Sequence, residues 1–169
     1  LVVGDIGDSA FLDSVFAAET IDAVIHFAGS IVVPESVADP LGYYLNNTVN
    51  SRLLIEKAVR NNVRNFIFSS TAAVYGKVPA EPVSELQPAL PETPYGRSKL
   101  MTEQMLADAA HAHDLRFTAL RYFNVSGADP RGRTGQSTPG ATHLLKVACE
   151  TATGKRNSMQ VFGSDWNTR

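Results

Sequence analysis

The chain has 169 residues, of which 44% are hydrophobic and 19% are charged, and its formal net charge is -2. This composition is typical of a globular protein with enough apolar material for a core, and it excludes an electrostatic basis for binding nucleic acid or an anionic membrane. No apolar run approaches the roughly 20 residues of a membrane span, and a single cysteine, Cys149, excludes an intrachain disulfide framework and favours a reducing compartment such as the cytoplasm.

The apolar pattern alternates along the chain between the period of a strand and the period of a helix. In chain order, the expected elements are a strand tail at 1–3, a helix at 9–19, a strand at 23–28, a helix at 40–62, a strand at 66–70, a helix at 94–113, a strand at 117–121 and a helix at 141–153. The continuous apolar run 23–28 is typical of a strand buried on both faces. Strands that alternate with helices of ten or more residues predict βαβ units and a parallel sheet.

Residues with functional character follow the predicted strands, at the end of the sheet where α/β proteins bind ligands. They lie in the segments 4–6, 27–30, 69–71 and 122–124. Each segment alone has an ordinary interpretation, because glycine forms turns and Ser or Thr caps the next element. Their coincidence at four strand ends favours a binding site.

Tyr95 and Lys99 lie four residues apart in the helix expected from Pro94, so they share one helix face. An ammonium beside a phenol stabilises the phenolate. A tyrosine that acts as a base near neutral pH needs a pKa about three units below its ordinary value, which corresponds to roughly 4 kcal/mol. An exposed lysine does not supply that much, so a dry site and a second positive charge are also expected.

Five segments resemble the extended short-chain dehydrogenase/reductase superfamily and, within it, the UDP-glucose 4-epimerase family. These segments are 4–6, 26–29, 66–76, 95–99 and 120–124. The Tyr-x-x-x-Lys motif after a strand tipped by Ser or Thr points to the superfamily, and residues 121–128 point to the epimerase branch. The likeness implies an α/β fold with a partial Rossmann-like doubly wound parallel sheet. Residues 1–124 would be the remainder of an NAD-binding domain, and residues 125–169 the beginning of a smaller sugar-nucleotide-binding region.

The resemblance implies an NAD-dependent isomerase of galactose metabolism that inverts C4 of a UDP-hexose through a 4-keto intermediate. Tyr95 would take the proton of the sugar 4-hydroxyl while C4 passes hydride to NAD. Lys99 would lower the pKa of Tyr95 and hold the nicotinamide ribose. Thr71, where the family usually has Ser, would bond the substrate oxygen. A homodimer is also implied. Two interpretations are open for Val49, Leu53 and Leu54: they belong to the core, or they form a dimer helix bundle together with Leu100, Met101 and Leu106, as the resemblance implies.

Binding residues are likewise implied by position in the family. Cofactor contacts are expected from Asp5, Ile6, Phe27, Ala28, Gly29, Ser30, Ile31, Asn46, Thr71, Tyr95, Lys99 and Phe123. Substrate contacts are expected from Thr71, Tyr95, Asn124, His143, Gln160, Val161 and Phe162. Ile31 stands where some members have lysine, and Thr142-His143 replaces the commoner Asn-Asn, so phosphate contacts are expected to differ at both places. No metal site is expected, because the four histidines have no ligand partners at useful spacing.

The glycine-rich phosphate turn of this superfamily is absent from the sequence. The resemblance therefore predicts that this turn precedes Leu1 and that the chain stops before the rest of the sugar-nucleotide region. By itself the chain is expected to bind NAD poorly and to turn over little substrate.

Two alternatives use the same scaffold. The first is a nucleotide-sugar 4,6-dehydratase or decarboxylase. Dehydratases usually have Asp-Glu after the Thr at the strand end, as acid and base. This chain has Ala72-Ala73 there, so the groups for elimination are missing. The other is a non-catalytic dinucleotide-binding regulator. Such proteins typically lose the tyrosine or the lysine, and both are present here.

Overall fold

The computed structural model describes residues 1–78, 82–138, 140–161 and 163. Its elements are α1 (Ser9–Ala18), β1 (Ala23–His26), α2 (Val33–Ala38), α3 (Pro40–Tyr44), the π-helical turn η1 (Leu45–Val49), α4 (Asn50–Arg60), β2 (Asn65–Ser69), the 3-10 turn η2 (Ala72–Tyr75), α5 (Pro94–Ala112), β3 (Arg116–Leu120) and α6 (Leu144–Ala152). The chain divides into two compact units, residues 1–123 and 124–169. The roles assigned to these two stretches from the sequence stay predictions.

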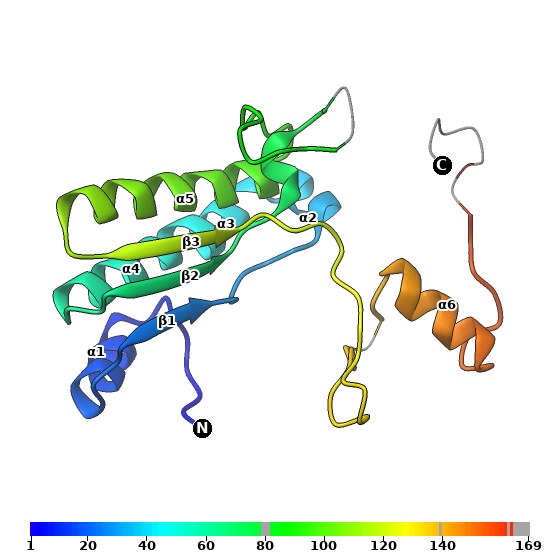
Figure 1. Ribbon diagram of the computed structural model, residues 1–169, viewed down its shortest axis with the longest axis horizontal. Helices are drawn as coiled ribbons and strands as arrows, with labels where there is room; N and C mark the ends of the chain where they lie inside the picture. Colours follow the sequence, from blue (N-terminus) through cyan, green and yellow to red (C-terminus); the bar gives the residue numbers. More distant parts are fainter. Residues whose placement is uncertain (79–81, 139, 162, 164–169) are drawn as a thin grey trace. The chain divides into compact units, whose positions relative to one another are not determined.

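The first unit contains a three-stranded parallel sheet in the order β1-β2-β3 (Figure 1). Ala23 of β1 pairs with Asn65 of β2, which in turn pairs with Arg116 of β3. Helices run between consecutive strands, as parallel pairing requires. The Rossmann-like α/β fold class expected from the sequence is therefore confirmed.

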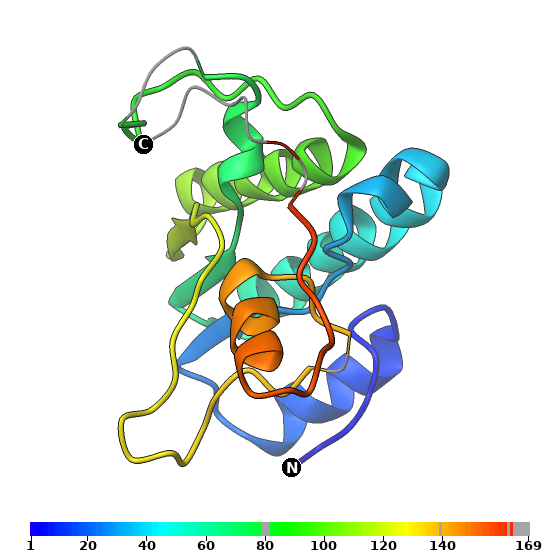
Figure 2. The same cartoon turned by 90° about the vertical axis from the view of Figure 1, so that its right-hand side faces the viewer.

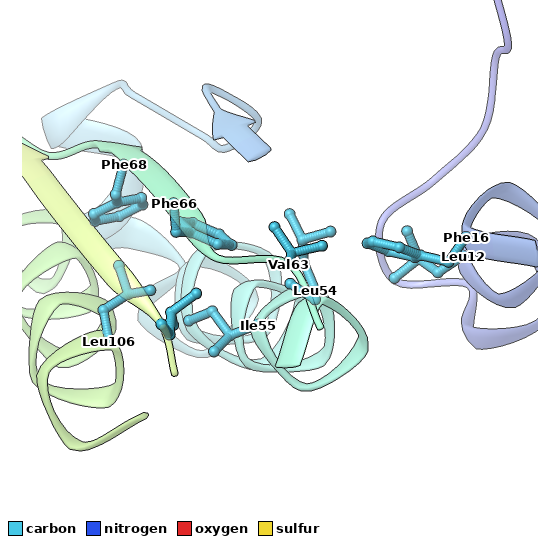
Figure 3. Close-up of a cluster of buried hydrophobic side chains, with 10 residues drawn as sticks. Leu12, Phe16, Leu54, Ile55, Val63, Phe66, Phe68 and Leu106 are labelled. Carbon is cyan, nitrogen blue, oxygen red and sulfur yellow. The ribbon is translucent and has the colours of Figure 1, made fainter. Parts of the chain in front are cut away.

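A buried apolar core lies between this sheet and the helices α1, α4 and α5 (Figure 3). Its buried members are Leu12, Phe16, Leu54, Ile55, Ala58, Val63, Phe66, Phe68, Leu106 and Leu115. Along β2 burial alternates, with Phe66 and Phe68 buried and their strand neighbours half-buried. Leu54 and Leu106 are buried in this core, so the core interpretation of Leu54 is confirmed, and neither side chain is exposed for a helix bundle.

Two expected strand features differ from the structure. Residues 1–3 form no strand, because the sheet of the described chain offers them no hydrogen-bonded neighbour. The strand at 23–28 is shorter, and it is not buried on both faces, since Ile25 is 60% exposed. β1 is an edge strand of this sheet. Its apolar sequence is typical of a strand buried on both faces, but one face of β1 is exposed.

The expected helices form with local corrections. Asp8 caps α1 by accepting hydrogen bonds from Ala10 N (2.9 Å) and Phe11 N (3.1 Å). The helix expected at 40–62 is interrupted at 45–49 by the π-helical turn η1. α5 begins with Pro94 after the cap Thr93, whose hydroxyl accepts from Gly96 N at 3.2 Å. In the described part of the chain, no helix combines the length and apolar character needed to cross a bilayer.

Candidate active site

The carboxyl ends of the three strands lie along one edge of the sheet, on the right in Figure 1 and toward the viewer in Figure 2. The segments that leave this edge carry Gly29 and Ser30 after β1, Thr71 after β2 and Phe123 after β3. The first turns of α5 bring Tyr95 and Lys99 to the same region, as the contacts below show. The first unit therefore collects most of the predicted cofactor residues and all three predicted catalytic residues.

Tyr95 is almost fully buried, with 9% of its surface exposed. Burial raises the pKa of its phenol above the ordinary value. Interaction with the Thr71 hydroxyl lowers the pKa, and the nearby Tyr122 raises it, without changing the net direction. Lowering of the Tyr95 pKa by Lys99 stays a prediction.

Lys99 is 3% exposed, and burial lowers the pKa of its ammonium to about 8. Its Nζ donates to the Ser69 carbonyl at 3.1 Å and lies 5.0 Å from the centroid of the Phe68 ring. An ammonium has three donors. Because one donor is used by Ser69, the others suit a hydroxyl-rich ligand.

Gly29 brings backbone close to that ammonium. Its φ is +152°, and a Cβ there would lie 3.0 Å from Asn47 Oδ1 and 3.4 Å from Lys99 Nζ. A larger residue would crowd both polar groups in a backbone conformation that favours glycine. A glycine beside a lysine with donors to spare fits the ribose of a dinucleotide.

His26 lies behind Lys99, at the end of β1. It is 2% exposed, its Nε2 is hydrogen-bonded to Ser51 Oγ at 2.8 Å, and its ring lies 5.5 Å from that of Phe68. Burial, followed by the charge of Lys99, lowers the pKa of His26 to about 4. At neutral pH the imidazole is uncharged, so it adds no second positive charge beside Lys99.

Asn47 is a buried residue of this region that the sequence analysis did not name. It is 1% exposed; its Oδ1 accepts from Ser30 N at 2.8 Å, and its Nδ2 donates to Ser30 O at 2.9 Å and to Ser98 Oγ at 3.2 Å. The predicted residue Asn46 donates to Ser30 Oγ at 2.8 Å. The Asn-Asn pair in η1 thus ties the loop after β1 to α5, and the pair itself was the signal in the sequence.

Thr71 joins the ends of β2 and β3. Its hydroxyl caps η2 by accepting from Ala73 N at 3.2 Å, while the adjacent Ala72 N donates to the Tyr122 carbonyl at 3.1 Å. The Tyr122 hydroxyl is hydrogen-bonded to Ser69 Oγ. These bonds fix the Thr71 hydroxyl next to Tyr95.

The remaining predicted cofactor residues lie at the margin of this cluster. Phe27, Ile31 and Phe123 are 62%, 62% and 70% exposed, and Ala28 is also exposed. Asp5 accepts from Gly7 N at 2.7 Å, and Ile6 packs against the core. A Cβ on Gly7 would lie 2.9 Å from the Asn50 amide, which places this loop beside the start of α4.

Most predicted substrate residues belong to the second unit. His143 precedes α6 and its Nδ1 is hydrogen-bonded to Gln136 Nε2 at 2.7 Å. Asn124, Gln160 and Val161 are exposed within that unit. Phe162 lies outside the described residues. The approach of these residues to Tyr95 stays a prediction.

Comparison with known proteins shows the family of the chain. The model of the NAD dependent epimerase/dehydratase family matches residues 1–169. The UDP-glucose 4-epimerase of Azospirillum brasilense is 58% identical over 168 residues, which cover 99% of this chain and 48% of that protein.

Solved structures give the same result. The UDP-glucose 4-epimerase of Brucella ovis in complex with NAD matches with a TM-score of 0.92 and 44% identity, over 99% of this chain and 51% of that one. The enzyme from Bifidobacterium longum in complex with NAD+ and UDP matches with a TM-score of 0.90 and 40% identity, over the same shares. The chain spans about half the length of the relatives it matches. Because the family model matches the whole length of the chain, the chain belongs to the NAD dependent epimerase/dehydratase family.

Proposed function

We propose that the whole protein interconverts UDP-glucose and UDP-galactose by inverting C4 of the sugar. The observation that carries the proposal is the convergence of Thr71, Tyr95 and Lys99 at the carboxyl ends of the strands. The UDP-glucose 4-epimerases named above support it, because they match this chain along nearly its whole length.

Two hydroxyl groups would act on the substrate. The Tyr95 phenol would exchange a proton with the 4-hydroxyl of the sugar, and the Thr71 hydroxyl, which interacts with that phenol, would hold the same oxygen. Burial of Tyr95 keeps water away from its phenol and strengthens the electrostatic interactions of that group. Asn124, His143, Gln160, Val161 and Phe162 would bind the nucleotide part of the substrate.

NAD, when bound, would supply hydride chemistry at the sugar C4 and return to its starting state. Lys99 would hold the ribose with its unused donors, next to Gly29, and Asn46 would border the cofactor through Ser30. The chain leaves the pKa of Tyr95 raised. A second positive charge from the oxidised ring would favour the phenolate that the proton transfer needs.

The residues that follow Thr71 favour this reaction over elimination. Ala72 and Ala73 form the beginning of η2 and carry neither an acid nor a base. A dehydratase needs such groups to remove water from the sugar. Retention of Tyr95 and Lys99 favours an enzyme over a non-catalytic regulator.

Incubation of the whole protein with UDP-galactose tests the proposal. We expect UDP-glucose to appear without added NAD, because the cofactor is regenerated in every cycle. Chromatography of the nucleotide sugars measures the product. A 4-keto-6-deoxy sugar would instead identify a dehydratase, and dinucleotide binding without conversion would identify a regulator.

We also propose that the protein is a homodimer located in the cytoplasm. Exposed apolar side chains run along α3 and η1: Leu41 is 77%, Leu45 58% and Val49 49% exposed. α5 packs against both elements and exposes Met101 beside them. A second copy of the chain would bury these side chains, and the single cysteine fits a reducing compartment.

Leu45→Glu is expected to convert the dimer to a monomer, because a carboxylate would be forced into an apolar interface. Sedimentation velocity on the whole protein measures the change. Leu86→Glu, at a 93% exposed loop position away from α3, is the matched control and is expected to leave the dimer intact. A Leu45→Glu protein that sediments like the wild type would rule out this interface.

A further inference from the structure

An ion pair between a buried glutamate and a half-buried arginine lies close to the candidate catalytic residues in the chain. Glu103 is 6% exposed, and its Oε2 accepts from Nε and Nη2 of Arg121 at 3.0 Å and 2.5 Å. Its Oε1 accepts from Arg121 Nε at 3.1 Å and from the Ser70 hydroxyl. The Arg121 guanidinium lies 5.0 Å from the centroid of the Tyr75 ring. We name Ser70, Tyr75, Glu103 and Arg121 the Glu103 cluster.

The Glu103 cluster joins every element that presents a catalytic side chain. Ser70 immediately precedes Thr71, and Tyr75 ends the η2 turn that Thr71 caps. Glu103 lies four residues beyond Lys99 on α5, and therefore on the face of the helix that carries Lys99. Arg121 follows β3 and precedes Tyr122, whose carbonyl accepts from Ala72 N. The ends of β2 and β3 are thus tied to α5 at one point.

Stability alone is a weak reason for such a pair. Removing two charges from water is expensive, and apolar residues of similar volume often stabilise a protein as well or better. The planar guanidinium, in contrast, accepts a carboxylate in few orientations. The Arg121–Glu103 pair, whose carboxylate is buried, therefore restricts where α5 can sit against the two strands.

We propose that Glu103 and Arg121 are positioning residues that set the separation between the Thr71 and Tyr95 hydroxyls. The inference rests on the proposed function, in which both hydroxyls act on one substrate oxygen. A displacement of about 1 Å in such an arrangement lowers the rate by about 100-fold. Substrate and cofactor contacts made by other elements are much less sensitive to this separation.

Arg121→Met and Glu103→Gln in the whole protein test the inference. Both are expected to lower kcat for UDP-galactose by about tenfold or more, with KM and the Kd for NADH changed by less than about threefold. The double variant is expected to retain more activity than Arg121→Met, because it leaves no buried carboxylate without a partner. Glu103→Gln keeps the shape of the side chain, so it provides the test if Arg121→Met does not fold.

Lys57→Met is the matched control. Lys57 is also 6% exposed and is paired at 2.5 Å with Asp13, whose side chain is 60% exposed; this pair joins α1 to α4 and touches no strand end. Its removal is expected to change the midpoint of urea unfolding while kcat stays within about twofold of the wild type. The comparison separates the loss of an ion pair with one buried member from the loss of positioning.

Equal effects of Glu103→Gln and Lys57→Met on kcat would overturn the inference, as would a parallel loss of kcat and NADH affinity. A crystal structure of Arg121→Met gives a readout that does not depend on activity. A Thr71–Tyr95 separation unchanged from the wild type would reject the positioning role. Absence of UDP-galactose conversion by the wild type would reject the proposed function instead, and the crystal structure would still decide the inference.

Discussion

Tyr95→Phe is expected to lower kcat for UDP-galactose by about 100- to 10,000-fold, the range that a positioned acid or base contributes. The ring of phenylalanine fills the same buried space, so the change removes the proton carrier and little packing. The Kd for NADH is expected to stay within about threefold of the wild type, because the donors of Lys99 remain. Single-turnover conversion of UDP-galactose, followed by chromatography, measures the effect.

Tyr44→Phe serves as the matched control for the loss of a phenolic hydroxyl. Tyr44 ends α3 and has no role in the proposed chemistry. Its variant is expected to turn over at the wild-type rate. Wild-type conversion by Tyr95→Phe would show that the proton is carried by another group, and the proposed mechanism would be wrong.

Lys99→Met is expected to impair catalysis and to stabilise the folded protein. Burial lowers the pKa of Lys99 from 10.5 to about 8, so holding the ammonium in the folded state costs about 3 kcal/mol. The cost is present in full below about pH 8 and declines as the pH rises from there to the ordinary pKa of 10.5. Methionine carries no charge and fills a similar volume.

Urea unfolding of the whole protein checks this prediction. At neutral pH the variant is expected to gain up to about 3 kcal/mol in free energy of unfolding, reduced by loss of the bond to the Ser69 carbonyl. The gain is expected to shrink at about pH 9.5. Lys77→Met, at an exposed lysine, is expected to change nothing. A Lys99→Met protein less stable than the wild type at every pH would contradict the stated cost of burial.

Local signals in the sequence predicted the helices whose first residues favour a helix start. Asp8 and Pro94 mark the starts of α1 and α5, and the spacing of Tyr95 and Lys99 places both side chains at the site. Tertiary contacts were harder to predict. Nothing local distinguishes Asn47, which bonds the loop after β1 and α5, from Asn46 beside it. Burial raises the pKa of Tyr95, and burial depends on contacts with residues distant in the sequence, such as Thr71 and Tyr122.

The same limit applies to the strand at 23–28 and to the Glu103 cluster. An apolar run predicts burial, but Ile25 lies at the edge of this three-stranded sheet. Glu103 and Arg121 are 18 residues apart, and their ion pair requires the return of β3 beside β2. Charged side chains are mostly exposed in proteins, so nothing in the sequence points to the burial of Glu103.

The Asn47 amide engages both the N–H and the carbonyl of Ser30, as a neighbouring strand would. This loop is ordered by the protein's own side chains, so an arriving dinucleotide has little chain entropy to remove. A rigid binding loop of this kind favours slow dissociation of a bound dinucleotide. Under the proposed function the cofactor would be oxidised and reduced within a single cycle, and a long residence time would suit that cycle because the cofactor would not need to exchange.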